Sequence, residues 1–241
     1  MKAPSLIGGI GLTRVTVYEQ RPAPDGLHSG CPHLHALSDE AYYVLEGEGE
    51  VAFFDAVHGL RKLKLEPGLY LHFPPLVLHR IISFRRLAIL GIMGSAGLAE
   101  RGDARIYFGP AADADAGEYE RLRSLPARLG LEGALERRDA SVRAFGELLR
   151  LWEEDRAAAR ERFEAFVSAH LQAAANLREP FRALIDTGSL AWGQRAAQRL
   201  EALPGRGPEG PEIGFERQPQ GTCFGMCGLL HPVTQLTALG S

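Results

Sequence analysis

Up to about residue 112 the chain consists of short apolar runs separated by Gly, Pro and Asp. The runs are rich in Val, Ile, Tyr and Phe, which favour strands, and no long helical period interrupts them. We therefore expect a sandwich or barrel of short strands, and not a parallel sheet with crossover helices. The runs lie at 14–20, 41–47, 50–56, 60–65, 68–74, 77–84, 86–93 and 104–110.

Beyond residue 112 the apolar positions change to the spacing of a helix face. An i, i+3, i+4, i+7 pattern predicts helix over residues 139–178, and Pro180 limits this run. A further helix, or two broken near Gly188, is predicted in the segment that follows. The apolar stripes are Phe145, Leu148, Leu149 and Trp152, and then Phe163, Phe166, Val167, His170, Leu171 and Ala174.

These patterns divide the chain into three segments. We expect a β-barrel over 1–112, an α-helical domain over 113–203, and a Gly/Pro-rich linker with an irregular tail over 204–241. The predicted fold class is α+β. Residue His170 falls on an apolar helix stripe, so we interpret it as a core or interface histidine. The helical domain carries no motif that indicates a function, and its apolar stripes could cover the barrel, form a helical bundle or mediate homodimerisation.

Composition and charge narrow the class of protein. The hydrophobic content of 45% is sufficient for a packed core, and the net charge of -3 argues against nucleic acid as a partner. We expect no membrane partner, because no segment has the apolar length of a membrane span. The N-terminus is a poor candidate for a signal peptide, and three cysteines are few and odd in number. Both features favour a location in the reducing cytoplasm.

Candidate chemistry is concentrated around His33, His35 and Glu40. In an extended strand two residues spaced H-x-H point to the same side, so both imidazoles can face one cavity. Glu40 follows at the start of the next strand, and imidazole with carboxylate suits iron, manganese, nickel, copper or zinc. His79 is the best candidate for a fourth ligand, because a glycine, a strand and a Pro-Pro turn precede it.

At these residues the sequence resembles the cupin superfamily. The segment from His33 through Glu40 to Gly47 is similar to the first cupin motif, G-x5-H-x-H-x3,4-E-x6-G. Gly68, Pro74 and His79 match the second, G-x5-P-x-G-x2-H-x3-N. The resemblance covers about residues 10–110 and departs from the motifs at three places. Gly26 lies one residue too early, Leu76 replaces a glycine, and Ile82 or Ser83 stands where the motif has Asn.

The resemblance implies a double-stranded β-helix, that is, a small jelly-roll barrel. It also implies one divalent metal inside the barrel, held by His33, His35, Glu40 and His79. Four ligands on an octahedral ion leave two positions for a small molecule or O₂. The leading hypothesis is an Fe- or Mn-dependent dioxygenase, with Zn, Ni and Cu as the other metals considered. The alternatives are a cupin ligand sensor with a helical interaction domain, and a cupin isomerase or decarboxylase.

Strand alternation predicts which residues line the site. With Glu40 and His79 inward, Tyr42, Val44, Val77 and Ile81 should be inward too, together with Leu69, Leu71 and Phe73. The predicted substrate pocket is Val44, Phe73, Val77 and Ile81. Tyr42 is the candidate catalytic group, which either hydrogen-bonds a bound oxygen or only packs in the barrel. The same alternation places Tyr70 and His72 outside, and we interpret Arg80, Arg85 and Arg86 as exposed arginines at strand edges.

The tail contains a second set of candidate ligands, Cys223, Cys227 and His231. Three interpretations stay open: a zinc site, redox-active thiols, or plain buried or free thiols. Glycines and a proline in this segment oppose the helix that would align the three residues. Cys31 could join them if the tail folds back onto the barrel.

Overall fold

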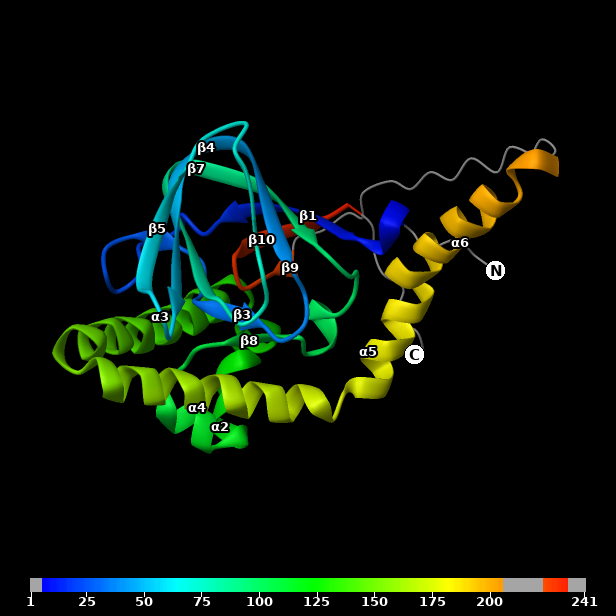
Figure 1. Cartoon of the computed structure of the whole chain (residues 1–241). Coiled ribbons are helices and arrows are strands. Elements are labelled where there is room, and N and C mark those ends of the chain that lie inside the picture. The colour runs from blue at the N-terminus through cyan, green and yellow to red at the C-terminus, as the bar shows by residue number, and fades with distance from the viewer. Residues whose placement is uncertain (1–5, 206–222, 234–241) are drawn as a thin grey trace.

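The computed structural model describes residues 6–205 and 223–233. A β-barrel rests on a layer of helices that covers one side of it (Figure 1). The α+β class predicted from the sequence is confirmed. The strands are β1 (Gly11–Val17), β2 (His28–Ser29), β3 (His33–His35), β4 (Glu40–Asp55), β5 (Gly59–Leu65), β6 (Tyr70–Phe73), β7 (Leu78–Met93), β8 (Ala104–Ile106), β9 (Cys223–Phe224) and β10 (Gly228–Pro232).

Two long strands, β4 and β7, form the centre of the sheet and pair with each other antiparallel. Each runs through two of the short strands expected from the sequence, because the chain bends without ending the strand. The bend in β4 is at Gly47, whose φ of 81° favours glycine, and a Cβ there would lie 2.3 Å from the Arg86 carbonyl oxygen. The bend in β7 is at Arg86, which itself has a φ of 45°.

Two departures from the cupin motifs have visible structural consequences. Leu76, which stands where the motif has glycine, adopts a left-handed φ of 64° in the turn before β7. Ser83, near the motif's Asn position, accepts a hydrogen bond of 3.0 Å from the Leu87 amide and donates one to Glu19. The Ser83 side chain thereby holds the bend of β7.

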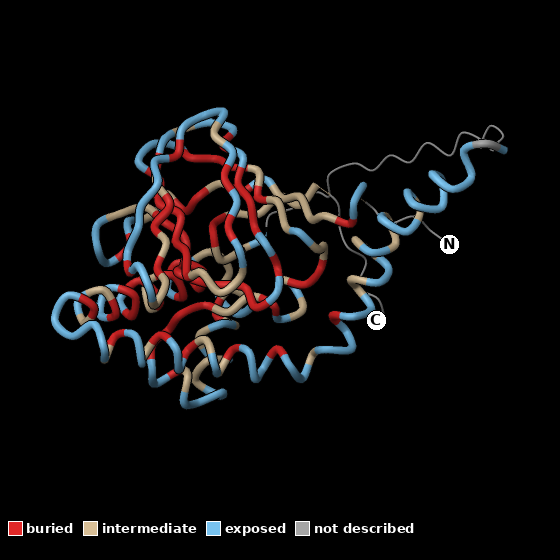
Figure 2. Tube along the Cα trace, in the orientation of Figure 1, coloured by how far each residue is buried: buried red, intermediate tan, exposed pale blue. Residues whose placement is uncertain are grey.

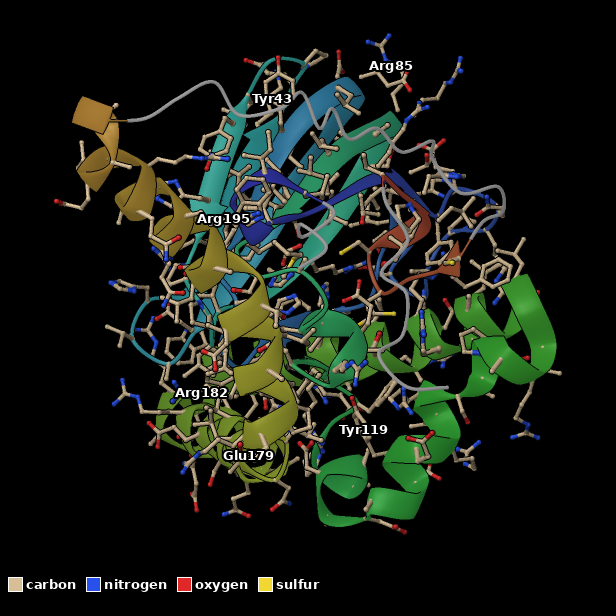
Figure 3. The ribbon with its side chains drawn as sticks, turned by 90° about the vertical axis from the view of Figure 1, so that its right-hand side faces the viewer. Tyr43, Arg85, Tyr119, Glu179, Arg182 and Arg195 are labelled. Atoms are coloured by element: carbon tan, nitrogen blue, oxygen red, sulfur yellow. The ribbon has the colours of Figure 1, made fainter. Side chains whose placement is uncertain are left out.

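Alternation along β4 separates the inside of the barrel from the outside. Tyr42 is fully buried, whereas Tyr43 is 41% exposed and lies on the outer surface (Figure 3). The interior residues form one apolar cluster, which we call the barrel core. It comprises Val15, Val17, Tyr42, Val44, Val51, Leu65, Leu71, Phe73, Ile81, Leu87, Ile89 and Cys227.

The helices follow the barrel in the chain. Short helices η1 (Ile7–Gly9), η2 (Ala99–Arg101) and η3 (Leu203–Gly205) accompany α1 (Pro110–Ala114), α2 (Ala116–Arg123), α3 (Leu125–Glu154), α4 (Arg156–Ala175), α5 (Arg178–Thr187) and α6 (Ser189–Glu201). Asp155 caps α4 by accepting hydrogen bonds from the amides of Ala157 and Ala158. No described helix has the length and apolarity needed to span a membrane.

The helix pair α3 and α4 packs on the barrel (Figure 2). Helix α5 buries Phe181 against Ala36 and Leu98, and α6 then extends away from the barrel. The interface between the barrel and the first pair is a second apolar cluster, which we call the helix–barrel core. It comprises Leu34, Phe54, Leu78, Tyr107, Ala144, Phe145, Leu148, Trp152, Ala159, Phe163 and Phe166.

The C-terminal tail differs from its prediction, because its described part is not irregular. Strand β10 pairs antiparallel with β1, and β9 pairs with β10. The strand was not expected because it is short and its partner lies about two hundred residues earlier in the chain. A Cβ at Gly228 would lie 2.2 Å from the Thr16 carbonyl oxygen, so only glycine allows this approach. Most of the linker predicted at 204–212 lies outside the described residues.

Candidate metal centre

The structure brings together the four side chains predicted as metal ligands. Strand β3 carries His33 and His35, β4 begins at Glu40, and His79 is the second residue of β7. Strands β3 and β7 pair so that His33 lies directly opposite His79. One potential ligand atom from each residue lies within 4.8 Å of the others, and all four residues are buried. These four form one group spaced to hold a metal ion.

Hydrogen bonds at the Nδ1 atoms fix the ring orientations of His33 and His79. His33 Nδ1 lies 2.9 Å from the Cys31 carbonyl oxygen, and His79 Nδ1 lies 3.1 Å from the Val77 carbonyl oxygen. A carbonyl oxygen can only accept, so each ring carries a hydrogen on Nδ1, and the lone pair of its neutral form is then on Nε2. The two Nε2 atoms face each other at 3.1 Å. Two opposed lone pairs need a cation or a proton between them.

Glu40 completes the donor set. Its Oε2 atom lies 3.2 Å from His35 Nε2 and 3.1 Å from His79 Nε2, and it makes no hydrogen bond of good geometry to any described residue. Bonds of about 2.0–2.1 Å at right angles place neighbouring ligand atoms about 3 Å apart. These spacings, the unsatisfied carboxylate oxygen and the mixture of imidazole and carboxylate fit one divalent transition metal.

The charges of the metal-free cluster are set by burial and by close partners. Burial and the neighbouring His79 hold the pKa of His33 well below its usual value, so this imidazole is neutral. Burial by itself raises the pKa of Glu40, but His79 and His35 outweigh it and hold that pKa well below its usual range. Burial lowers the pKa of His35, yet the adjacent carboxylates of Asp103 and Glu40 raise it to about 9.

Asp103 is a functional residue that the sequence reasoning missed. It is fully buried between η2 and β8, and its Oδ2 atom lies 3.1 Å from His35 Nδ1. The other oxygen, Oδ1, accepts a hydrogen bond of 2.7 Å from the Leu37 amide. A carboxylate behind a ligating histidine fixes the ring's orientation and raises its basicity. Only the pairing of β8 with β3 places it there, so no sequence motif signals it.

His170 connects the helices to this centre. The prediction of a core histidine is confirmed, because His170 is 2% exposed on α4. Its Nε2 atom donates to the Asp103 carbonyl oxygen at 2.7 Å. The neutral ring suits this role, since burial lowers the pKa of His170. A chain of contacts therefore runs from α4 through Asp103 to His35.

The predicted pocket residues occupy the barrel core with one exception. Val44, Phe73 and Ile81 are buried there, and the Phe73 ring centroid lies 4.7 Å from that of His79. Val77 is half-buried and lies outside this core, because it precedes β7 and does not follow the strand's alternation. His72 is exposed on β6, as expected.

Tyr42 is close to the candidate ligands. Its ring centroid lies 6.4 Å from that of His79, and its hydroxyl is buried without a hydrogen-bond partner among the described residues. Burial, together with the Glu40 carboxylate, raises the pKa of Tyr42 well above its usual value. The hydroxyl therefore remains protonated and is free to donate.

The expectation of three exposed arginines is wrong for Arg80. Its side chain is buried and donates to Asp25 at 2.6 Å and to Ser29 at 2.7 Å. Strand alternation faces Arg80 away from the barrel core, toward Ser29 of β2 and Asp25 in the loop before it. Arg85 is exposed at the outer end of the barrel, where it pairs with Glu48 (Figure 3).

The tail residues do not form a site of their own. Cys223 is exposed, whereas Cys227 is 8% exposed and belongs to the barrel core. Within the described residues, no group of three metal-binding side chains includes Cys223, Cys227 or His231. The tail does fold back onto the barrel, and Cys227 Sγ lies 3.5 Å from His33 Nε2.

A hollow elsewhere on the molecule carries no comparable chemistry. It measures about 580 Å³ and lies between α4 and the turn that joins β4 to β5. Its wall is mostly apolar and includes Leu76, Phe163, Val167 and Leu171. None of the four candidate ligands lines it. The centre of interest is therefore the buried cluster inside the barrel.

Comparison with known proteins agrees with this geometry. Residues 19–83 match the family model described as a cupin domain, and all four candidate ligands lie in that range. The barrel is a cupin domain. Among curated proteins, the comparison found no match to the chain.

Solved structures with similarity to this chain include other cupins. A cupin protein from Bacteroides fragilis is 25% identical, with a TM-score of 0.28 over 37% of this chain and 68% of that one. An oxalate oxidase in complex with the substrate analogue glycolate is 16% identical, with a TM-score of 0.37 over 57% and 65%. A sugar 3,4-ketoisomerase from Thermoanaerobacterium thermosaccharolyticum, in complex with TDP, is 17% identical, with a TM-score of 0.32 over 39% and 63%.

Proposed function

We propose that this protein is a metal-dependent cupin that acts on a small molecule, and specifically an Fe(II)- or Mn(II)-dependent dioxygenase. The observation that supports this proposal most directly is the pair of imidazole nitrogens that face each other at 3.1 Å. When both rings carry their hydrogen on Nδ1, both nitrogens are acceptors, and the adjacent Glu40 oxygen makes no hydrogen bond of good geometry to any described residue. A metal cation placed among these atoms would satisfy all three acceptors at once.

His33, His35, Glu40 and His79 would hold the ion. When bound, iron or manganese would supply a Lewis acid and a one-electron donor that lets O₂ react with an organic substrate. Four protein ligands would leave two of six positions for exogenous molecules. Asp103 would orient His35, and the carbonyl groups of Cys31 and Val77 would orient the other two imidazoles.

Tyr42 and the apolar wall would determine which substrate binds and how it is oriented. The Tyr42 hydroxyl is a protonated, unpartnered donor, so it can hydrogen-bond an oxygen atom of the substrate or give it a proton. Val44, Phe73 and Ile81 exclude water and favour an apolar body. The implied substrate class is a small, mostly apolar molecule with oxygen donors at one end.

Metal analysis and oxygen uptake test the proposal. Protein purified without added metal should contain about one equivalent of transition metal. The double variant H33A/H79A should contain none, whereas the matched control H72A, which removes an exposed histidine, should retain it. Oxygen consumption should then be measured with catechols, thiols and diketones. Full metal content in H33A/H79A would refute the ligand assignment.

A second candidate function is a ligand sensor, and one observation favours it. The hydrogen bond from His170 on α4 to Asp103 connects the helical segment to His35, so a change at the centre could reach the helices. A sensor would bind one of the test compounds without consuming oxygen. Turnover that persists without oxygen would instead indicate an isomerase or a decarboxylase.

A further inference from the structure

The hollow beside α4 has the size of a small-molecule site. It measures about 580 Å³, which lies within the range of about 300–1,000 Å³ typical of ligand pockets. One side of it is formed by α4, and the other by Leu76 and the turn that joins β4 to β5. None of the four candidate metal ligands lines it, so an occupant would be a second ligand of the protein.

The two sides of the hollow are joined and fixed. Asp55 Oδ1 accepts hydrogen bonds of 2.8 Å from the amides of Val57 and His58, which orders the turn between β4 and β5. Arg160 of α4 donates through Nε to the Ala56 carbonyl oxygen at 3.0 Å and holds this turn against the helix. A site whose walls are already ordered loses little conformational freedom when a ligand binds.

Helix α4 presents two parallel rows of side chains to the hollow. Residues four positions apart are neighbours on a helix surface, so each row runs along the helix, over a rise of about 12 Å. The apolar row is Phe163, Val167 and Leu171, and the polar row is Glu164, Ser168 and Gln172. An elongated amphipathic molecule that lies along the helix matches both rows at once.

The charge of the lining selects a cation. Among the described residues that line the hollow there is no Lys, Arg or His, and its two charged groups are the carboxylates of Asp55 and Glu164. Asp55 already pairs with Arg61 and His58, whereas Glu164 forms no ion pair with any described residue. An ammonium group beside Glu164 would be attracted, and a carboxylate there would be repelled.

Leu76 connects this hollow to the candidate metal centre. Its amide donates a hydrogen bond of 2.9 Å to the His35 carbonyl oxygen. The carbonyl oxygen of the next residue, Val77, lies 3.1 Å from His79 Nδ1. Leu76 also has a left-handed φ of 64°, which is unfavourable for a residue with a Cβ. A strained turn therefore contacts the hollow on one side and two candidate ligands on the other.

Helix α4 provides a second connection. His170 lies between Val167 and Leu171 in the sequence, and its Nε2 atom donates to the Asp103 carbonyl oxygen at 2.7 Å. The Asp103 carboxylate in turn lies 3.1 Å from His35 Nδ1. An occupant that packs against α4 would thus press on the residues that orient His35.

We propose that the hollow is a regulatory site for an elongated amphipathic ammonium molecule, whose binding is coupled to metal binding through Leu76 and His170. The apolar body of the ligand packs on the apolar row of α4, and its cation lies beside Glu164. The coupling rests on the proposed metal site, whereas binding to the hollow does not. Coupling between two sites is reciprocal, so each ligand must change the affinity of the other by the same factor.

Calorimetry with octylammonium and the metal-free full chain tests the binding site. Octylammonium should bind about five- to tenfold more tightly than octanoate, which has the same length and the opposite charge. The neutral 1-octanol should fall between them. No binding of octylammonium, or equal binding of octanoate, would overturn the site.

Two variants place the ligand in the hollow. E164Q should weaken octylammonium binding about two- to fivefold and leave 1-octanol binding unchanged. Its matched control is E161Q, which alters an exposed glutamate of α4 outside the hollow. L171A should weaken both compounds about threefold or more, while L129A, which truncates an exposed leucine of α3, should weaken neither. Unchanged affinities in both E164Q and L171A would overturn the proposal.

Zinc affinity tests the coupling. It should be measured by chelator competition with and without saturating octylammonium, and we expect a change of about fivefold or more. Zinc should change the octylammonium affinity by the same factor, and the double variant E164Q/L171A should show no effect at the same concentrations. An unchanged zinc affinity would overturn the coupling and leave the binding site. A wild type that takes up no zinc would overturn the coupling and the proposed function together, with octylammonium binding unaffected.

Discussion

The barrel core and the helix–barrel core take up neighbouring residues of the same strand but differ in what they enclose. Phe53 of β4 packs against the barrel core, and the next residue, Phe54, is fully buried in the helix–barrel core. Phe54 makes edge contacts there with Trp152 and Phe163 at centroid separations of 5.3 Å. The helix–barrel core is apolar, whereas the barrel core surrounds three imidazoles and a carboxylate.

The difference shows what each core contributes. Burying aromatic surface stabilises the helix–barrel core without any ligand. The barrel core surrounds acceptors that face one another, so under the proposed metal site part of its stability would depend on a bound cation. The helix–barrel core therefore holds the helices on the barrel. The stability of the barrel core, in contrast, should change with what the barrel binds.

The largest effect is expected in the helix–barrel core. F54A should lower the free energy of unfolding by about 3–5 kcal/mol, because it removes a ring from a packed interface. Urea unfolding measures this. F84A is the control: Phe84 is 57% exposed on β7, and its loss should cost less than about 0.5 kcal/mol. A loss in F54A as small as in the control would mean that the two units are not joined through this core.

Metal should stabilise the barrel core separately. At free metal one hundred times its dissociation constant, the free energy of unfolding should rise by about 2.7 kcal/mol. Thermal unfolding with Zn²⁺ and with a chelator measures this increment. H79A should show no increment, while F54A should keep it if it remains folded. An equal increment in H79A would contradict the binding site.

Asp103 should affect the metal affinity without being a ligand itself. D103N removes the carboxylate behind His35, and metal affinity should fall about 10- to 100-fold. Competition with a coloured chelator gives the affinity. D113N is the matched control, because Asp113 is also a largely buried carboxylate but pairs with Arg105, outside the ligand cluster. Equal affinities in D103N and wild type would show that Asp103 has only a structural role.

The pH dependence of metal uptake follows from His35. Its pKa of about 9 in the metal-free chain means that a proton occupies the imidazole at neutral pH. The ion must displace this proton, so affinity should rise about tenfold per pH unit between pH 7 and about 9 and then level off. In D103N the levelling should begin at lower pH, since a partner that raises the pKa is gone. Calorimetry in buffers of different ionisation enthalpy counts the released proton.

The cluster of four candidate metal ligands could be predicted from the sequence because most of its geometry is local. Two residues apart in a strand share a face, and Glu40 begins the next strand, so His33, His35 and Glu40 are fixed by short spacing. His79 follows from the turn that precedes it. The apolar wall follows from the same alternation, except at Val77, which lies just outside its strand.

Only the tertiary structure decided which residues contact these candidate ligands. Asp103 is 68 positions from His35, and Cys227 is 194 positions from His33. No periodicity relates such distant positions, because their proximity arises from the pairing of β8 with β3 and of β10 with β1. The sequence by itself determined the candidate ligands, through the two-residue repeat that puts His33 and His35 on one face and through the strand starts at Glu40 and His79. The folded chain determined their partners, their charges and the hairpin that closes over them, because these depend on contacts between segments that the sequence keeps far apart.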